Sequence, residues 1–152
     1  MSKNKRSSRK QIPKSAGGSL RSFPTVHNRK AHEGGTDDLP PSFSFYHFDT
    51  NKECPSEWTG EQVKALFALM QMASSMLWRR VKDTGGSRGG KVGVGFTPVE
   101  PKDCKRKLPD KLAEDVDLSE MRVDNAARIF GIRHEATYYV IWLDRNHLVL
   151  PG

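Results

Sequence analysis

The sequence predicts an α+β fold in which a mainly antiparallel sheet of four or five strands packs on one long helix. Apolar residues follow helical spacing through 59–82. Two runs with strand composition, separated by four residues, occupy 126–143 near the end of the chain. A length of 152 residues fits one domain, which we place at 40–152.

Residues 1–39 are predicted to form a disordered basic tail, because few large apolar side chains are present to offset chain entropy. Residues 1–35 hold nine Lys or Arg and one acid, which gives this segment a net charge of +8. The net charge of the full chain is +7. The remaining chain is therefore close to neutral. Such a tail attracts phosphate through counterion release, and the predicted contacts are Lys3, Lys5, Arg6, Arg9 and Lys10. The alternative is a tail that only increases solubility.

The sequence contains no membrane-spanning run of apolar residues, and no apolar core follows the basic N-terminus as in a secretory signal. The apolar residues of an amphipathic transit peptide are also scarce. Cys54 and Cys104 form no metal-binding pattern with the histidines, and we expect unpaired thiols. The sequence therefore predicts a cytoplasmic protein with no cofactor, no metal ion and no membrane partner.

The first elements of the domain follow from periodicity and capping. The side chains of residues 42–49 alternate between the two sides of an extended chain and are rich in aromatic rings, which predicts a strand. Thr59 and Gln62 form a capping-box pair at the start of the helix at 59–82. Gly85 and Gly86 then favour its termination.

The middle of the chain is rich in glycine and proline. The loop at 85–90 lacks the order of a phosphate-binding motif. Residues 91–96 alternate valine and phenylalanine with lysine and glycine, which predicts a strand with a bare outer face that accepts a partner strand. Residues 111–116 are predicted to make one helical turn.

The runs at the end of the chain predict a hairpin whose two faces differ. If Arg133 pairs with Tyr138, then Trp142 lies on the same face, and Gly131 leaves a gap between the three side chains. We expect this face to be open, while the aliphatic face meets the helix. Asp144 or Asn146 is predicted to stabilise the polar turn that follows.

The element order, with Arg and Tyr on the hairpin, resembles the RelE/ParE class of small bacterial toxins. The last residues also resemble a set of small uncharacterised proteins from prokaryotes and their phages. Those proteins carry an FG-x-R strand and a W-x-D-x-x-H ending, which correspond here to 130–133 and 142–147.

The toxin resemblance implies RNA cleavage without a metal, in which the 2′-oxygen attacks the adjacent phosphorus. Its implied catalytic residues are His134 or His147 as base or acid, Arg133 for the phosphate, and Tyr138 for base stacking. Further contacts to nucleic acid are expected from Arg128, Trp142 and Arg145. The implied partners are RNA or the ribosome, and an antitoxin or other protein.

Two other functions fit the same residues. One is a non-catalytic protein-interaction module of a mobile-element, phage or defence system. The other is a nucleic-acid-binding protein anchored by its basic tail. Each candidate residue also has a structural alternative: Arg133 with Tyr138 as a stacked cross-strand pair, Trp142 as core, and His147 as an exposed turn residue.

Overall fold

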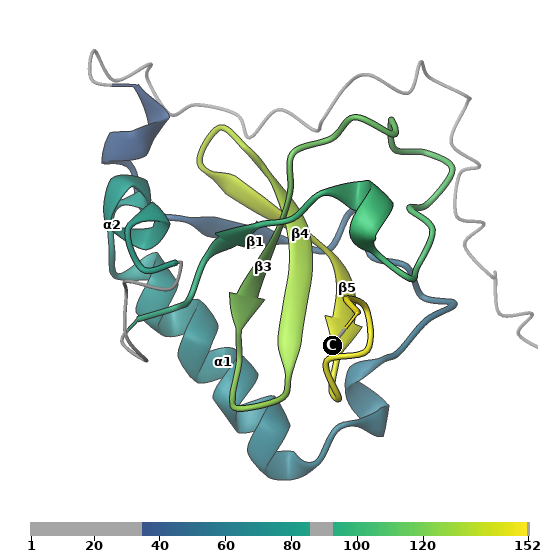
Figure 1. Ribbon diagram of the computed structural model, residues 1–152. Helices are drawn as coiled ribbons and strands as arrows, with labels where there is room; N and C mark the ends of the chain where they lie inside the picture. Colours follow the sequence, from purple (N-terminus) through teal and green to yellow (C-terminus); the bar gives the residue numbers. More distant parts are fainter. Residues whose placement is uncertain (1–34, 86–92, 152) are drawn as a thin grey trace, which may run out of the picture.

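The computed structural model describes residues 35–85 and 93–151, and has an α+β fold with a five-stranded mixed sheet and one main helix (Figure 1). The strands are β1 (Ser42–Ser44), β2 (Thr97–Pro98), β3 (Leu118–Arg122), β4 (Arg128–His134) and β5 (Thr137–Asp144), in the order β1-β5-β4-β3-β2. The α+β class is thus confirmed. The sheet is mixed because β1 runs parallel to β5, whereas the other three pairings are antiparallel.

The first strand is much shorter than the alternation at 42–49 suggests. β1 ends at Ser44, and the chain turns so that the amide of Phe48 donates to the carbonyl of Phe45 at 3.0 Å. The amide of Asp49 then donates to the carbonyl of Ile141 on β5 at 3.0 Å. The aromatic residues of this segment therefore form a turn that is fastened to the neighbouring strand.

The helix begins as predicted but ends early. In α1 (Gly60–Ser74) the amide of Gln62 donates to Thr59 Oγ1 at 3.2 Å, and Gln62 Oε1 accepts from the amide of Thr59 at 3.1 Å. This confirms the capping box. The Ser75 hydroxyl donates to the carbonyl of Met72 at 2.7 Å, which satisfies a carbonyl at the end of the helix.

A second short helix, α2 (Trp78–Lys82), replaces the predicted last turns of the single helix. Leu77 has extended backbone angles and separates the two helices. This break lets Trp78 enter the core, where its Nε1 donates to the carbonyl of Ala136 at 2.9 Å. Burial of this indole supplies a tertiary contact that local helix propensity does not encode.

The predicted register of the hairpin is confirmed near its turn and is wrong beyond a β-bulge. The pairs His134–Thr137, Arg133–Tyr138 and Gly131–Val140 agree with the predicted pairing. An irregularity between Phe130 and Gly131 then shifts the register, so that Phe130 lies opposite Trp142. The bulge moves Trp142 to the other face of the sheet.

The face that the sequence predicts to be open is instead the one that meets the helices, and the other face is covered as well. Tyr138, Val140 and Leu143 belong to the cluster that packs against α1 and α2. Phe130, Ile132, Ile141 and Trp142 pack instead beneath the segment 99–116 and the C-terminal turn. Figure 1 shows the helices on one side of the sheet and the long green segment crossing the other.

Two smaller predictions are also wrong. Within the described residues 93–96 there is no strand; Gly93 and Gly95 have φ values of 90° and 59°, and the Arg122 side chain occupies the space beside Gly95. Residues 111–116 contain turns and no helix. A 3-10 helix, η1 (Thr36–Asp38), precedes the predicted domain boundary at residue 40. Residues 91 and 92 lie outside the described part.

No helix among the described residues is long and apolar enough to cross a bilayer. Cys54 and Cys104 are free thiols, as predicted.

Candidate functional site

The structure does not place arginine, phenol and indole on one open face. Tyr138 and Trp142 are each 0% exposed and belong to different core clusters. The Tyr138 hydroxyl donates to the carbonyl of Ser119 at 2.9 Å, and burial raises the pKa of this phenol. Its ring fills the space beside Gly131, where an added Cβ would lie 2.7 Å from Cε1. Neither aromatic side chain is accessible for stacking on a nucleobase.

Arg133 is held by structural contacts at the tip of the hairpin. Its guanidinium lies 4.5 Å from the centre of the Trp78 ring and 2.5 Å from Asp37 Oδ1. Nε also donates to the carbonyl of Glu135 at 2.8 Å. The charge of Arg133 is therefore compensated by a carboxylate, and the cation–π contact fixes its position.

The predicted catalytic residues fall at opposite ends of the hairpin. His134 pairs with Thr137 beside the connecting turn, whereas Arg128 pairs with Asp144 at the far end. Six residue steps along β4 correspond to about 20 Å. His134 and His147 therefore cannot act as base and acid on one phosphate.

Asp144 organises the turn that carries His147, as the sequence predicts. Its Oδ1 accepts from the amide of Leu148 at 2.9 Å and its Oδ2 from the amide of Val149 at 2.8 Å. His147 adopts a φ of 56° within this turn. The buried carboxylate stabilises this left-handed backbone conformation and directs the imidazole toward β3.

His147 lies beside a carboxylate that the sequence analysis missed. Its Nε2 is 3.9 Å from Glu120 Oε2, and its side chain is 41% exposed. Glu120 Oε1 is 4.0 Å from Nε of Arg128. Arg122 is exposed and lies directly opposite Arg128 on the paired strand. We name these four residues, Glu120, Arg122, Arg128 and His147, the C-terminal cluster.

Burial raises the pKa of Glu120, while the charges of Arg128, His147 and Arg122 act in the opposite direction. Oε2 is buried and accepts no hydrogen bond from a protein group. Arg128 is itself largely buried and donates to the carbonyls of Asp124 and Ala127 at 2.9 and 3.0 Å. Within this cluster, His147 and Arg122 are the groups that face solvent.

Arg145 has a structural role next to this cluster. Its amide donates to both carboxylate oxygens of Glu53, at 3.2 and 3.0 Å, and its guanidinium donates to the carbonyl of Glu57. Arg106 lies 3.7 Å from the same Glu53 and donates to the carbonyl of Leu143 at 2.8 Å. Glu53 therefore fastens the C-terminal turn to the loop that carries Arg106.

Glu120 escaped prediction because it interrupts an apolar strand face. Leu118 and Glu120 share the face of β3 that points toward the 99–116 segment, so the strand shows no simple alternation. The signal that could have found it is the pair of charged residues two positions apart, Glu120 and Arg122, which lie on one face of a strand. Lys3, Lys5, Arg6, Arg9 and Lys10 lie outside the described residues.

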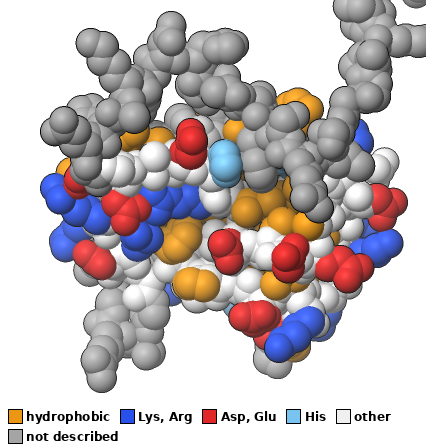
Figure 2. Space-filling view, turned by 90° about the horizontal axis from the view of Figure 1, so that it is seen from above, with side chains coloured by type: hydrophobic (Ala, Val, Ile, Leu, Met, Phe, Trp, Pro, Cys, Tyr) orange, Lys and Arg blue, Asp and Glu red, His pale blue; other side chains and the backbone are white. Residues whose placement is uncertain are grey.

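The surface around the helices is not uniformly basic. Lys and Arg side chains gather at the left of Figure 2, the side of α2, with Asp and Glu side chains between them. Arg79 pairs with Asp38 at 2.7 Å and Lys82 with Asp37 at 2.5 Å. These cations are neutralised locally and do not form a phosphate-binding face.

Comparison of this chain with protein-family models, with curated proteins and with solved structures gives no match. The functional argument therefore depends on the geometry described above.

Proposed function

We propose that this protein acts on RNA as a toxin-like, metal-independent endoribonuclease, with the C-terminal cluster as its reaction site. The observation that carries the proposal is the exposed His147 beside the buried carboxylate of Glu120, on which the charge of Arg122 also acts. A carboxyl group next to one ring nitrogen orients the imidazole.

The cluster supports a transesterification within the RNA chain. His147 takes the proton of the 2′-hydroxyl, and the 2′-oxygen bonds to the adjacent phosphorus. The bond from phosphorus to the 5′-oxygen breaks, which leaves a 2′,3′-cyclic phosphate and a 5′-hydroxyl that takes a proton from water. Arg122 compensates the charge on the non-bridging oxygens, and the RelE/ParE resemblance favours the same chemistry.

In this proposal Glu120 and Arg128 are positioning residues. Glu120 is too buried to reach RNA, and it faces Nε2 of His147 at 3.9 Å. Arg128 lies on the other oxygen of the same carboxylate. A cytoplasmic location follows from an RNA or ribosomal substrate and belongs to the same proposal.

The test compares RNA cleavage by the full chain and by single variants, in the presence of EDTA. His147→Gln is expected to lower kcat/KM by a factor of about 10² to 10⁴, the usual contribution of a general base. Arg122→Gln is expected to lower kcat by about tenfold or more. His134→Gln is the matched control, since it replaces an exposed histidine at the other end of the same hairpin. Equal cleavage by the His147 and His134 variants would contradict the proposal.

The second candidate is RNA binding without cleavage. The observation in its favour is the net charge of +8 carried by residues 1–35. This candidate predicts intact RNA under all conditions, with affinity that falls steeply with salt and is lost when 1–35 are deleted.

A further inference from the structure

The aromatic turn after β1 exposes two rings on a rigid support. Phe45 is 46% and Tyr46 is 66% exposed. Their neighbours hold them in place: Phe48 packs edge-on against Phe45 at 5.8 Å, and His47 against Tyr46 at 4.9 Å. His47 in turn contacts the ring of Tyr139 on β5 at 5.4 Å. The two exposed rings are therefore preorganised, so that a ligand would lose little entropy in ordering them.

A basic loop lies next to this turn. Residues 102–111 contain five Lys or Arg and two Asp, although the chain beyond residue 35 has a net charge of −1. Lys102, Lys105, Lys107 and Lys111 are all exposed. The turn is bonded to Ile141 through the amide of Asp49, and Leu108 and Leu112 of the loop pack in the cluster that contains Ile141, so loop and turn both border the same part of β5. The charge of Lys111 also contributes to the lowered pKa of His47, after the larger effect of burial.

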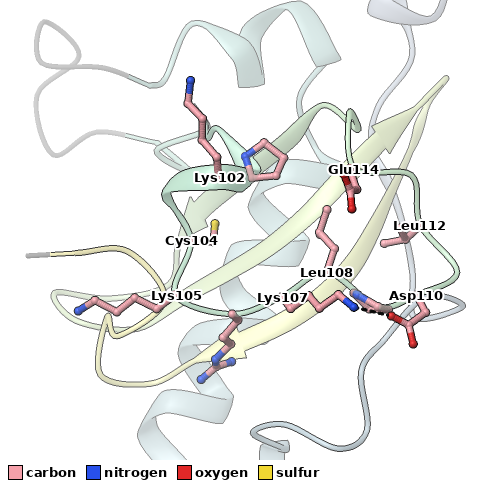
Figure 3. Close-up of a pocket in the computed structure, with 11 residues that line it drawn as sticks. Lys102, Cys104, Lys105, Lys107, Leu108, Asp110, Leu112 and Glu114 are labelled. Carbon is pink, nitrogen blue, oxygen red and sulfur yellow. Dashed lines mark hydrogen bonds and ion pairs between the residues drawn. The ribbon is translucent and has the colours of Figure 1, made fainter.

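The loop surrounds a cavity of about 580 Å³ whose inner wall includes Cys104, Leu108 and Leu112 (Figure 3). In this view Lys102 and Lys105 extend away from the cavity, whereas Lys107 runs toward Asp110. The Lys107–Asp110 pair, at 3.1 Å, has both side chains more than four-fifths exposed. Such a pair is worth little in water, so Lys107 can exchange it for a phosphate.

The same loop touches the turn that carries His147. The amide of Lys105 donates to the carbonyl of Val149 at 2.7 Å. The loop thus forms a basic path that borders the C-terminal turn at Lys105 and the aromatic turn at Lys111.

We infer that single-stranded RNA binds along this path, with bases stacked on Tyr46 and Phe45 and phosphates beside Lys105, Lys107 and Lys111. The inference rests on the proposed function and supplies its substrate-binding surface. Exposed rings beside cations suit nucleobases joined by phosphates, because stacking accepts any base and the lysines follow the backbone. An acidic peptide would engage the lysines without requiring the rings.

The test uses the full chain and a fluorescein-labelled 2′-O-methyl adenine oligomer of about 12 nucleotides. The methyl group blocks the 2′-oxygen, so that binding is measured by anisotropy without cleavage. Tyr46→Ala is expected to weaken binding by about tenfold and Tyr46→Phe by less than roughly twofold, since the ring is kept. Lys107→Gln is expected to reduce the slope of log affinity against log salt by about 0.7.

Two control variants lie on α1. Phe67→Ala removes a ring that is 65% exposed, and Lys64→Gln removes an exposed charge. Neither residue adjoins the path, so both variants should bind the oligomer as tightly as the wild type does. Equal affinities of the Tyr46→Ala and Phe67→Ala variants would overturn the inference. Displacement of the oligomer by polyglutamate, with no dependence on Tyr46, would overturn it in favour of a protein partner.

The binding assay also separates this inference from the proposed function. Binding that depends on Tyr46, with RNA left intact by the wild type, would support the surface and remove the endoribonuclease. Cleavage that depends on His147, with KM unchanged in Tyr46→Ala and Lys107→Gln, would support the reaction site and remove the surface.

Discussion

Replacement of Asp144 by alanine removes the acceptor of two hydrogen bonds that shape the C-terminal turn. The side chain is buried, and its two oxygens accept from the amides of Leu148 and Val149 at 2.9 and 2.8 Å. A hydrogen bond to a charged group contributes about 1.5–3 kcal/mol, and a buried donor left without an acceptor costs a similar amount. We therefore expect the free energy of unfolding to fall by about 3–5 kcal/mol.

Asp144→Asn keeps one acceptor oxygen and places an NH₂ group against the second amide. The expected loss is about 1.5–3 kcal/mol, between that of alanine and that of the wild type. The matched control is Asp110→Ala, which removes a carboxylate from an ion pair whose two side chains are 85% and 89% exposed. Its expected effect is less than about 0.5 kcal/mol.

The assay is urea unfolding followed by circular dichroism, with the dependence on urea concentration compared among variants to confirm a two-state transition. A loss below about 1 kcal/mol for Asp144→Ala, or equal values for Asp144→Ala and Asp110→Ala, would refute this account of the turn. Asp144→Asn should also slow RNA cleavage, because the turn positions His147.

Three further predictions concern packing, protonation and thiol reactivity. Gly131→Ala should lower the free energy of unfolding by about 1–3 kcal/mol, since the added Cβ would lie 2.7 Å from the Tyr138 ring and 2.3 Å from a backbone oxygen. Gly60→Ala is the control and should not destabilise the protein, because no atom lies within 4 Å of its added Cβ. Thermal unfolding of the two variants tests this, and equal losses would contradict it. Burial holds the pKa of Glu120 above 4.5, so the folded protein binds this proton more tightly than the unfolded chain does, and stability falls as pH rises through the folded pKa. The stability of Glu120→Gln relative to the wild type should therefore increase as pH rises through the folded pKa of Glu120, as urea titrations across pH would measure; a difference that does not change with pH would count against it. Burial raises the pKa of the Cys104 thiol to about 11, so its alkylation by iodoacetamide, followed by mass spectrometry, should accelerate about tenfold per pH unit up to that value. A rate that levels off below pH 9 would show an ordinary thiol.

Local signals in the sequence predict where the helix begins and how the C-terminal turn is stabilised, but not where the helix ends. The capping box at Thr59 and Gln62 and the turn-forming role of Asp144 depend on residues a few positions apart, and the structure has both. The end of α1 at Ser74 depends instead on burial of Trp78 against the hairpin. No residue near Ser75 in the sequence indicates the contact between Trp78 and the hairpin.

The candidate site was mispredicted for two reasons: the face that carries Tyr138 packs on the helices although its register was correct, and a β-bulge changes the face of Trp142. One extra residue on β5, opposite the step from Phe130 to Gly131, places Trp142 on the face opposite Tyr138, and period-two reasoning is then inverted for every later position of that strand. His147 was identified from the sequence, but its partner Glu120 becomes visible only when β3 pairs with β4. Contacts between segments far apart in the chain decided both outcomes.

The chemical ends of the cleaved RNA test the central claim most directly. Mass spectrometry of fragments made in EDTA should find 2′,3′-cyclic phosphate and 5′-hydroxyl ends from the wild type, and nearly none from His147→Gln. Fragments that end in 3′-hydroxyl and 5′-phosphate groups, or the same yield from both proteins, would contradict a reaction in which His147 takes the proton of the 2′-hydroxyl.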